Sequence, residues 1–250
     1  EWMIEASKAE HFAEAAAHGP GRIVPDYGVE FLGLTVPGDE SAPVEVRLKD
    51  AAGAERTTRA RYVVGCDGAR SRVRAEIGRV HVGDISQHAW GVMDVLVETD
   101  FPDWRIKCAI NAEAGNILHI PREGGYLSRV YVDLGAVAAD DDHRVRQTPI
   151  EEIIRRANEI LHPYTLDVRE VAWHSVYEVG HRVTDGFDDA HGTDRLPRVF
   201  LTGDACHTHS AKAGQGMNVS MQDGFNLGWK LGSVVSGLAP ASLLSTYAAE

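Results

Sequence analysis

One stretch near the C-terminal end constrains this chain most. The apolar run RVFLTG at residues 198–203 stops at a Gly-Asp pair, and a glycine-rich segment follows it. This order predicts a buried strand, a tight turn and then a long helix. Gly214 and Gly216 lie just before that helix, so its first backbone N–H groups lack intrahelical acceptors. Together with the positive end of the helix dipole, these groups predict a site for a phosphate, a carboxylate or an enolate-like oxygen.

The same stretch has a second interpretation, because thiolate and imidazole groups are zinc ligands. Cys206, His207 and His209 would then form the metal site of a zinc-dependent hydrolase. Successive residues on a strand point to opposite faces, however, and no second pair such as Cys-x-x-Cys occurs in the sequence. The spacing therefore favours a buried cysteine with hydrogen-bonded histidines on a turn, and no metal.

The helix that follows carries Gly224, Gly228 and Gly232, which are spaced by four and share one face. Each glycine costs a helix about 1 kcal/mol relative to alanine. The pattern therefore predicts the close approach of a backbone or a ligand, or tight packing of the helix against the sheet.

A second stretch, ARYVVGCDGARSRVRAEIG at residues 60–78, predicts a buried strand, a Cys-Asp-Gly turn and a helix capped by Ser71. Arg70, Arg72 and Arg74 crowd the first turn of this helix, where the dipole disfavours cations. A pyrophosphate group nearby would relieve that conflict. Solvated arginines on an exposed face are the alternative.

A third stretch, NILHIPREGGYLSRVYVDL at residues 116–134, predicts a strand hairpin. Arg129 and Tyr131 fall on one face of the second strand, and Arg122 precedes the turn. Two cations and a phenol suit an anionic aromatic ligand. A surface hairpin whose charged residues face water is the alternative.

The remaining pattern predicts an α/β (α+β) fold in three segments. Residues 1–84 read as a helix capped by Ser7, a small antiparallel meander and the Asp-Gly turn. Residues 85–195 read as a mostly antiparallel sheet, and residues 196–250 as the Gly-Asp strand with its helix. One helix interrupts the sheet, with Thr148 as N-cap, Pro149 at the first helical position and Glu151 completing a capping box.

The composition limits the classes of molecule that this protein is expected to bind and the compartment in which it is expected to occur. The 250 residues carry a formal net charge of -12, which disfavours nucleic acid and acidic membrane surfaces. No apolar run approaches the roughly 18 residues that span a bilayer, and no signal peptide is recognisable. Three irregularly spaced cysteines fit a reducing compartment, so a cytoplasmic location is expected. The first residue is Glu1 and the last segment is an unfinished helical pattern, so we expect a fragment of a longer chain.

Together these stretches resemble the flavin-dependent aromatic hydroxylases, the class A flavoprotein monooxygenases, in their phenol 2-monooxygenase and 3-hydroxybenzoate 4-monooxygenase subgroup. YVVGCDGARSRVR resembles the Asp-Gly motif of that family, which serves FAD and NADPH, and RVFLTGDACHTHSAKAGQGMN resembles its Gly-Asp motif. The resemblance implies part of an FAD-binding domain of the p-hydroxybenzoate hydroxylase type. The antiparallel sheet inserted into it is then the substrate domain.

The resemblance also implies roles for particular residues. Asp204 is expected to bind ribityl or ribose hydroxyls of FAD, and Asp67 and Arg70 to lie near the cofactor or the nicotinamide passage. The pyrimidine end of the flavin would be wrapped by Gly214, Gln215, Gly216, Met217 and Asn218. The positions expected near the flavin and the substrate are Arg122, Arg129 and Tyr131, with Tyr177 contacting the substrate's phenolic group.

The chemistry implied is hydride transfer from NADPH to FAD, addition of molecular oxygen, and attack of a flavin hydroperoxide on a small phenolic substrate. The full-length parent is expected to be a homodimer. Ala211 stands where the family usually has proline, and the loop REGGYLSR is one residue longer than in phenol hydroxylases. No Gly-x-Gly-x-x-Gly occurs, and the family's C-terminal thioredoxin-like domain is absent, so the isolated piece is expected to be inactive.

Two further alternatives stay open at this level. The same flavin motifs serve hydroxylases and epoxidases that act on bulky aromatic polyketides, and pocket size would discriminate between these substrates. A non-catalytic flavin-binding module would bind the cofactor without turnover.

Overall fold

The computed structural model describes residues 25–138, 141, 143–209 and 215–250. The chain forms two compact units, Glu1–Val63 and Val64–Glu250. The predicted division at residues 84 and 195 remains a prediction. The helix expected after Ser7 lies outside the described residues.

The first unit contains the predicted meander. Strands β1 (Glu30–Thr35), β2 (Val44–Lys49) and β3 (Glu55–Ala60) pair antiparallel in the order β1-β2-β3. Val44 and Val46 of the central strand are buried, because alternate side chains of a strand share one face. The prediction of a small antiparallel meander is confirmed.

The second unit begins with the Asp-Gly stretch. Strand β4 (Val63–Gly65) pairs with β10 (Val199–Leu201), and the short helix α2 (Arg72–Glu76) follows the turn. Ser71 caps this helix as predicted, because its Oγ accepts the Arg74 N–H at 2.9 Å. A Cβ on Gly65 would lie 2.8 Å from the Val73 Cβ, so glycine permits the close approach of α2 to β4.

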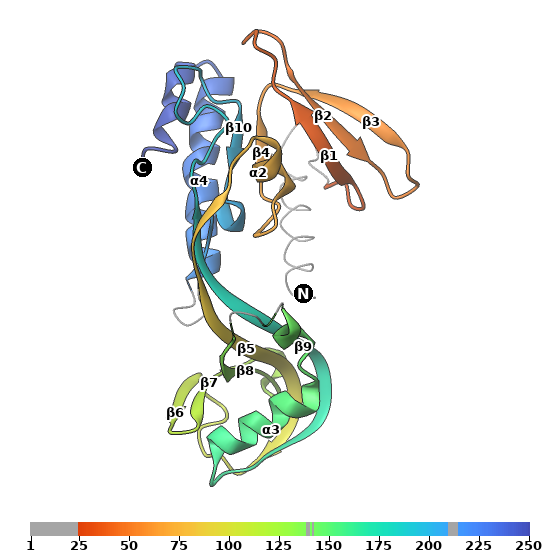
Figure 1. Ribbon diagram of the computed structural model, residues 1–250, viewed down its shortest axis with the longest axis vertical. Coiled ribbons are helices and arrows are strands. Elements are labelled where there is room, and N and C mark those ends of the chain that lie inside the picture. The colour runs from red at the N-terminus through yellow and green to blue at the C-terminus, as the bar shows by residue number, and fades with distance from the viewer. Residues whose placement is uncertain (1–24, 139–140, 142, 210–214) are drawn as a thin grey trace. The chain divides into compact units, whose positions relative to one another are not determined.

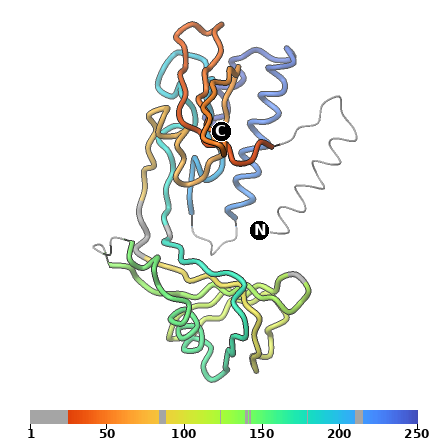
Figure 2. Tube along the Cα trace, turned by 90° about the vertical axis from the view of Figure 1, so that its right-hand side faces the viewer, coloured from red at the N-terminus to blue at the C-terminus, as the bar shows by residue number. Residues whose placement is uncertain are grey.

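A six-stranded sheet with the order β11-β9-β5-β8-β7-β6 fills most of the second unit, and every pair in it is antiparallel. The mostly antiparallel sheet predicted from the sequence is thus confirmed. The two longest strands, β5 and β9, run beside each other over most of their length (Figures 1 and 2). The strands are β5 (His81–Thr99), β6 (Cys108–Ala112), β7 (Gly115–Pro121), β8 (Leu127–Ala136), β9 (Leu166–Thr184) and β11 (His207–Thr208).

Helix α3 (Ile150–Leu161) covers one face of this sheet (Figure 1). Ile153 and Ala157 of the helix are fully buried in one cluster with Met93 and Val95 of β5. This face of the sheet is therefore the core of the unit, and the opposite face carries the candidate substrate residues.

The predicted capping box of α3 is wrong. Pro149 is the N-cap, and the hydroxyl of Thr148 donates to the Val145 carbonyl at 2.6 Å instead of capping the helix. Pro149 has φ of -69° and ψ of 155°, which is an extended conformation, so it lies before the first helical residue. The helix therefore starts one residue later than the pattern predicted.

The C-terminal part contains a one-turn 3-10 helix, η3 (Gly203–Ala205), the long helix α4 (Gly216–Val235) and a second 3-10 segment, η5 (Ala241–Thr246). A further short 3-10 turn, η1 (Glu123–Gly125), joins β7 to β8. None of the helices in the described residues is long and apolar enough to cross a membrane.

Candidate functional site

The Asp-Gly turn is stabilised by its own aspartate. The Asp67 carboxylate accepts hydrogen bonds from the Ser71 hydroxyl at 2.5 Å, the Arg72 N–H at 2.7 Å and the Val73 N–H at 3.1 Å. Asp67 therefore satisfies the first backbone donors of α2, which is how an acidic side chain stabilises a helix start. Arg70 is exposed at the same turn.

Arg74 joins the Asp-Gly turn to the Gly-Asp turn. Its guanidinium donates to the Ala69 carbonyl at 2.9 Å and to the Ala205 carbonyl at 3.0 Å. These carbonyl groups, 136 residues apart in numbering (205 minus 69), provide the negative partners that the sequence analysis assigned to a pyrophosphate. Burial, and then the charges of Arg74 and Arg182, lower the pKa of the neighbouring His81. Arg74 therefore holds the two turns next to each other.

The Gly-Asp turn is held against α4 by Asp223. One carboxylate oxygen of Asp223 accepts the Gly203 N–H at 3.0 Å and contacts His207 Nε2 at 2.6 Å. Gly203 has φ of 62°, a conformation that favours glycine. Asp204 follows it with an exposed side chain. Sequence reasoning missed Asp223, although an aspartate directly before Gly224 in a mostly uncharged helix was a usable signal.

Cys206, His207 and His209 do not form a metal-ligand set. Cys206 is fully buried, and burial followed by the charge of Asp223 raises the pKa of its thiol above the ordinary value. His207 instead contacts Asp223, and its ring stacks on that of His209 at a centroid distance of 6.2 Å. Within the described part of the chain, no three His, Cys, Asp or Glu side chains are grouped to hold a metal ion.

Helix α4 begins without a side-chain cap. Gln215 is the N-cap, and the first backbone hydrogen bond runs from the Val219 N–H to the Gln215 carbonyl at 2.9 Å. The N–H groups of Gly216, Met217 and Asn218 therefore precede the first intrahelical donor, and no acidic side chain lies in this turn. An open depression of about 480 Å³ lies over the same end of the helix. Its lining residues are Gln215, Asn218, Met221, Gln222 and Phe225.

These features fit the electron-rich edge of a flavin ring, because backbone donors and the helix dipole favour negative charge there. A Cβ on Gly216 would lie 3.1 Å from the His209 ring, so glycine also permits this histidine to pack against the helix start. Gly214 and Ala211 lie outside the described residues.

The glycine face of α4 has no close packing partner among the described residues. Apart from the adjacent residues and the helix's own nearby backbone, no described atom lies within 4 Å of a Cβ built on Gly224, Gly228 or Gly232. Neither a close backbone nor packing against the sheet accounts for these three glycines within the described chain. Met221 and Phe225 of the same helix are exposed as well.

The face of the sheet opposite α3 gathers the remaining candidates. Arg129 pairs with Asp94 in the strand register, Tyr131 with Val92, and Tyr177 with Trp90. Because the three partners on β5 alternate, their side chains share one face. The prediction that Arg129 and Tyr131 share a face is confirmed.

Asp94 binds two of the predicted arginines. Arg129 donates to its carboxylate through Nε at 2.7 Å and Nη2 at 2.6 Å, and Arg122 Nη1 lies 3.9 Å from it. The hydrogen bonds to Asp94 raise the pKa of Arg129 above its ordinary value despite partial burial. Arg129 also lies over the ring of Trp173, 5.4 Å from its centroid. Sequence reasoning missed Asp94, although it is the one charge in the apolar run GVMDVLV.

Tyr131 and Tyr177 lie on the two strands that flank β5, Tyr131 on β8 and Tyr177 on β9. Tyr131 is half-buried and lines a pocket of about 220 Å³ together with Trp90, Asn116 and Leu118. Tyr177 is 50% exposed on β9, beside Trp90. The structure therefore brings Arg122, Arg129 and Tyr131 together, with Tyr177 across the neighbouring strand.

Comparison with known proteins identifies the family of this site. The profile of a family described as an FAD binding domain matches residues 12–250. The chain belongs to this FAD-binding-domain family. Its Asp-Gly and Gly-Asp turns are thus parts of an FAD-binding fold, as the resemblance implied.

Relatives within the family are FAD-dependent monooxygenases. A 3-hydroxybenzoate 4-monooxygenase of Comamonas testosteroni is 51% identical over 99% of this chain and 40% of its own length. A phenol 2-monooxygenase of Aspergillus fumigatus is 42% identical over 83% of this chain and 34% of its own length. The predicted resemblance to this subgroup is confirmed, and the chain spans about 40% of the first of these relatives.

A solved structure gives the same fold. An aromatic hydroxylase from angucycline biosynthesis matches with a TM-score of 0.68 and 32% identity, over 89% of this chain and 42% of its own. The predicted α/β fold with an inserted antiparallel sheet is confirmed by this similarity.

Proposed function

We propose that the full-length protein hydroxylates a phenolic aromatic ring, using FAD, NADPH and molecular oxygen. The observation that carries this proposal is the junction made by Arg74, which joins the two flavin motifs through Ala69 and Ala205. An uncapped helix start lies in the element that follows the second motif. When bound, FAD would supply the transfer of electrons from NADPH to oxygen.

The residues of this chain would hold the cofactor in two ways. The first N–H groups of α4, at Gly216, Met217 and Asn218, would donate to the pyrimidine edge of the flavin, with Gln215 and Gly214 beside them. That edge becomes more negative on reduction, so donors fixed in advance stabilise the reduced state. The exposed Asp204 would accept from ribityl or ribose hydroxyls, and Asp67 and Arg70 would border the nicotinamide passage.

The substrate would lie on the sheet face opposite α3. Arg122 and Arg129 would border the flavin and the substrate with their guanidinium groups fixed by Asp94, and Tyr131 would contact the ring beside them. Tyr177, which is half exposed, would contact the phenolic hydroxyl of the substrate and relay its proton, which makes the ring more nucleophilic.

The partners proposed are a small phenol and oxygen, and the assembly proposed is a homodimer of the full-length protein in the cytoplasm. All three cysteines are free thiols, which fits a reducing compartment. The alternative substrate is a bulkier aromatic polyketide, which a hydroxylase or epoxidase would oxidise. The similarity to an aromatic hydroxylase from angucycline biosynthesis supports this alternative.

The test uses the purified full-length protein. We expect a yellow protein whose NADPH oxidation is stimulated by phenol, with a hydroxylated product in the mixture. The Tyr177→Phe variant should keep its FAD and lose at least tenfold in phenol-stimulated turnover, since one proton relay contributes about 10²-fold or more. NADPH oxidation that phenols leave unchanged would refute the proposal. Turnover by the 250-residue chain alone would refute the predicted inactivity of that piece.

A further inference from the structure

Arg74 has a partner besides the two carbonyl groups that it joins. Its Nη1 lies 3.2 Å from Nε2 of His81, the first residue of β5, and the same Nη1 donates to the Ala205 carbonyl at 3.0 Å. A terminal guanidinium nitrogen carries two hydrogens, so each of them has an acceptor here. His81 therefore completes the contacts of the nitrogen that reaches the Gly-Asp turn.

This contact fixes the position of the proton on the His81 ring. Arginine stays protonated and only donates, so the ring nitrogen opposite Arg74 must accept. Nε2 of His81 therefore carries no proton, and the neutral ring keeps its hydrogen on Nδ1. Protonation would make both ring nitrogens donors and would place a second positive charge beside Arg74.

Backbone contacts hold His81 at the junction of the two turns. His81 pairs with Thr184 of β9 in the strand register, and the Thr184 N–H donates to the Cys206 carbonyl at 2.6 Å. One residue of β9 thus links the start of β5 to the Gly-Asp turn. The position of His81 relative to Arg74 therefore does not depend on a mobile side chain elsewhere.

The surroundings of His81 disfavour a protonated ring. Burial, and then the charges of Arg74 on α2 and Arg182 on β9, lower the pKa of His81, whereas the carbonyl groups of Cys206 and Ala205 raise it less. The Cys206 thiol in the same turn is neutral, because burial raises its pKa. The charged side chains that act on His81 are therefore cations.

The carboxylates on the adjoining segments have other partners. Asp67 accepts the first N–H groups of α2, and Asp185 accepts the Val80 N–H at 2.9 Å and lies 3.9 Å from Arg79 Nη1. In the described part of the chain, neither carboxylate is within ion-pair distance of the His81 ring. A proton on His81 would therefore lack a carboxylate partner.

We propose that neutral His81 is a positioning residue of the FAD site: its Nε2 accepts from Arg74 and so fixes the guanidinium that joins the two flavin turns, and protonation of His81 releases that guanidinium. FAD binding then depends on pH. The pKa of histidine in an unfolded chain is about 6.5, and that of His81 lies below its ordinary value. The contact is complete above about pH 6.5 and is lost as the pH falls through the pKa of the folded protein.

The test measures the dissociation constant of FAD from the full-length apoprotein by fluorescence titration at pH 7.5 and pH 5.0. We expect the wild type to bind FAD about fivefold more weakly at pH 5.0, which is the size of one lost hydrogen bond. His81→Gln keeps an acceptor and does not titrate. Its dissociation constant should lie within about twofold of the wild-type value at pH 7.5 and change less than about twofold at pH 5.0. A fall of equal size in both proteins would overturn the proposal.

A second substitution separates the acceptor from the titration. His81→Leu removes both, so it should bind FAD about fivefold more weakly than the wild type at pH 7.5 and show no further fall at pH 5.0. The exposed His174 of β9 is the matched control, and His174→Gln should keep the pH dependence of the wild type. If His81→Gln binds FAD as weakly as His81→Leu at pH 7.5, the acceptor does not position Arg74 and the proposal is wrong.

A double substitution shows whether His81 acts through Arg74. In the Arg74→Met background, His81→Leu should change the dissociation constant of FAD by less than about twofold, because its partner is already absent. Additive effects would give His81 a role independent of Arg74 and contradict the proposal. The melting temperature of each apoprotein identifies a variant that does not fold. The comparison of the wild type with His81→Gln decides the question if His81→Leu does not fold.

The inference rests on the proposed function for the FAD site alone, and the substrate has no part in its test. FAD binding with the expected pH dependence, in a protein whose NADPH oxidation phenols leave unchanged, would refute the proposed function and support the role of His81. Phenol-stimulated oxidation, with an FAD affinity whose pH dependence is the same with and without His81, would refute this inference alone.

Discussion

Asp94 is 7% exposed, and its carboxylate contacts the guanidinium groups of Arg122 and Arg129. Removal of this carboxylate would leave the positive charges of both arginines uncompensated on the sheet face. We expect Asp94→Ala to lower the free energy of unfolding by about 2 kcal/mol, because Arg129 would keep a half-buried charge without its partner. Urea unfolding followed by circular dichroism measures the change.

The matched control for Asp94 is Glu45, whose ion pair with Arg59 at 3.2 Å is largely solvated. Glu45→Ala should change the free energy of unfolding by less than about 1 kcal/mol, as exposed pairs do. Equal effects of the two substitutions would contradict the role given to Asp94.

His119 is fully buried, and its Nδ1 contacts the Ile106 carbonyl at 3.1 Å. Burial lowers the pKa of His119, against the smaller opposing effect of that carbonyl. In the unfolded chain the pKa is about 6.5, so the unfolded state takes up a proton first as the pH falls. The stability from neutral His119 is complete above about pH 6.5 and is lost as the pH falls toward the folded pKa.

Urea unfolding at pH 7.5 and pH 5.5 tests this behaviour. We expect the wild type to be less stable at pH 5.5, and His119→Gln to show a smaller difference between the two pH values. His81, whose pKa is also lowered, contributes in the same direction and remains in the variant. A pH dependence that is unchanged in the variant would exclude His119 as its source.

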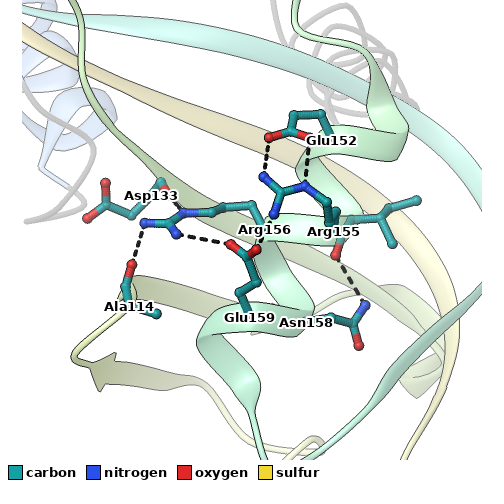
Figure 3. Close-up of polar contacts among 8 residues, drawn as sticks. Ala114, Asp133, Glu152, Arg155, Arg156, Asn158 and Glu159 are labelled. Atoms are coloured by element: carbon teal, nitrogen blue, oxygen red, sulfur yellow. Dashed lines mark hydrogen bonds and ion pairs between the residues drawn. The ribbon is translucent and has the colours of Figure 1, made fainter.

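At the scale of elements, α3 and the sheet are joined by buried apolar side chains and by one arginine. Arg156 reaches backbone carbonyls of β8 and of the turn between β6 and β7, whereas Arg155 pairs with Glu152 and Glu159 on the exposed side of the same helix (Figure 3). Both arginines pair with Glu159, and Arg156 donates in addition to the two backbone carbonyls of the sheet.

Arg156→Met should destabilise the protein by about 1 to 3 kcal/mol, because it leaves two carbonyl groups without their donor. Arg155→Met should have a clearly smaller effect, since its partners are solvated. Thermal unfolding of both variants gives the comparison. A larger effect of Arg155→Met would mean that surface charge, not the contact with the sheet, holds the helix.

At the scale of the whole molecule, Arg74 connects segments that are far apart in sequence. It donates to Ala69 in the first flavin motif and to Ala205 in the second. We expect Arg74→Met to weaken FAD binding by tenfold or more in the full-length protein, because both turns lose a shared donor. Fluorescence titration of the apoprotein with FAD measures the dissociation constant.

The neighbouring exposed Arg72 provides the control, since its substitution leaves the connection between the turns intact. Arg72→Met should change the FAD dissociation constant by less than threefold. If both variants bind FAD as the wild type does, the junction made by Arg74 does not position the cofactor site.

The strands, the faces on which their side chains lie and the two flavin motifs could be predicted from the sequence, because these features depend on local patterns. Alternation in SRVYV placed Arg129 and Tyr131 on one face, and Ser71 was recognised as a cap from its position before α2. It misplaced the start of α3 by one residue, because Pro149 is extended and the Thr148 hydroxyl donates to the Val145 carbonyl. It also expected a close backbone, a ligand or tight packing at Gly224, Gly228 and Gly232, and the described chain provides neither a close backbone nor packing there.

The sequence by itself determined the family, the flavin motifs and the antiparallel sheet, because motif spacing and hydrophobic alternation act over a few residues. Tertiary structure alone decided which groups meet across the chain: Asp94 with two arginines, Asp223 with the Gly-Asp turn, and Asp133 with His88 and Asn116. Such pairings depend on strand register and on helix packing. A shift of one residue in either would place the same side chains on opposite faces.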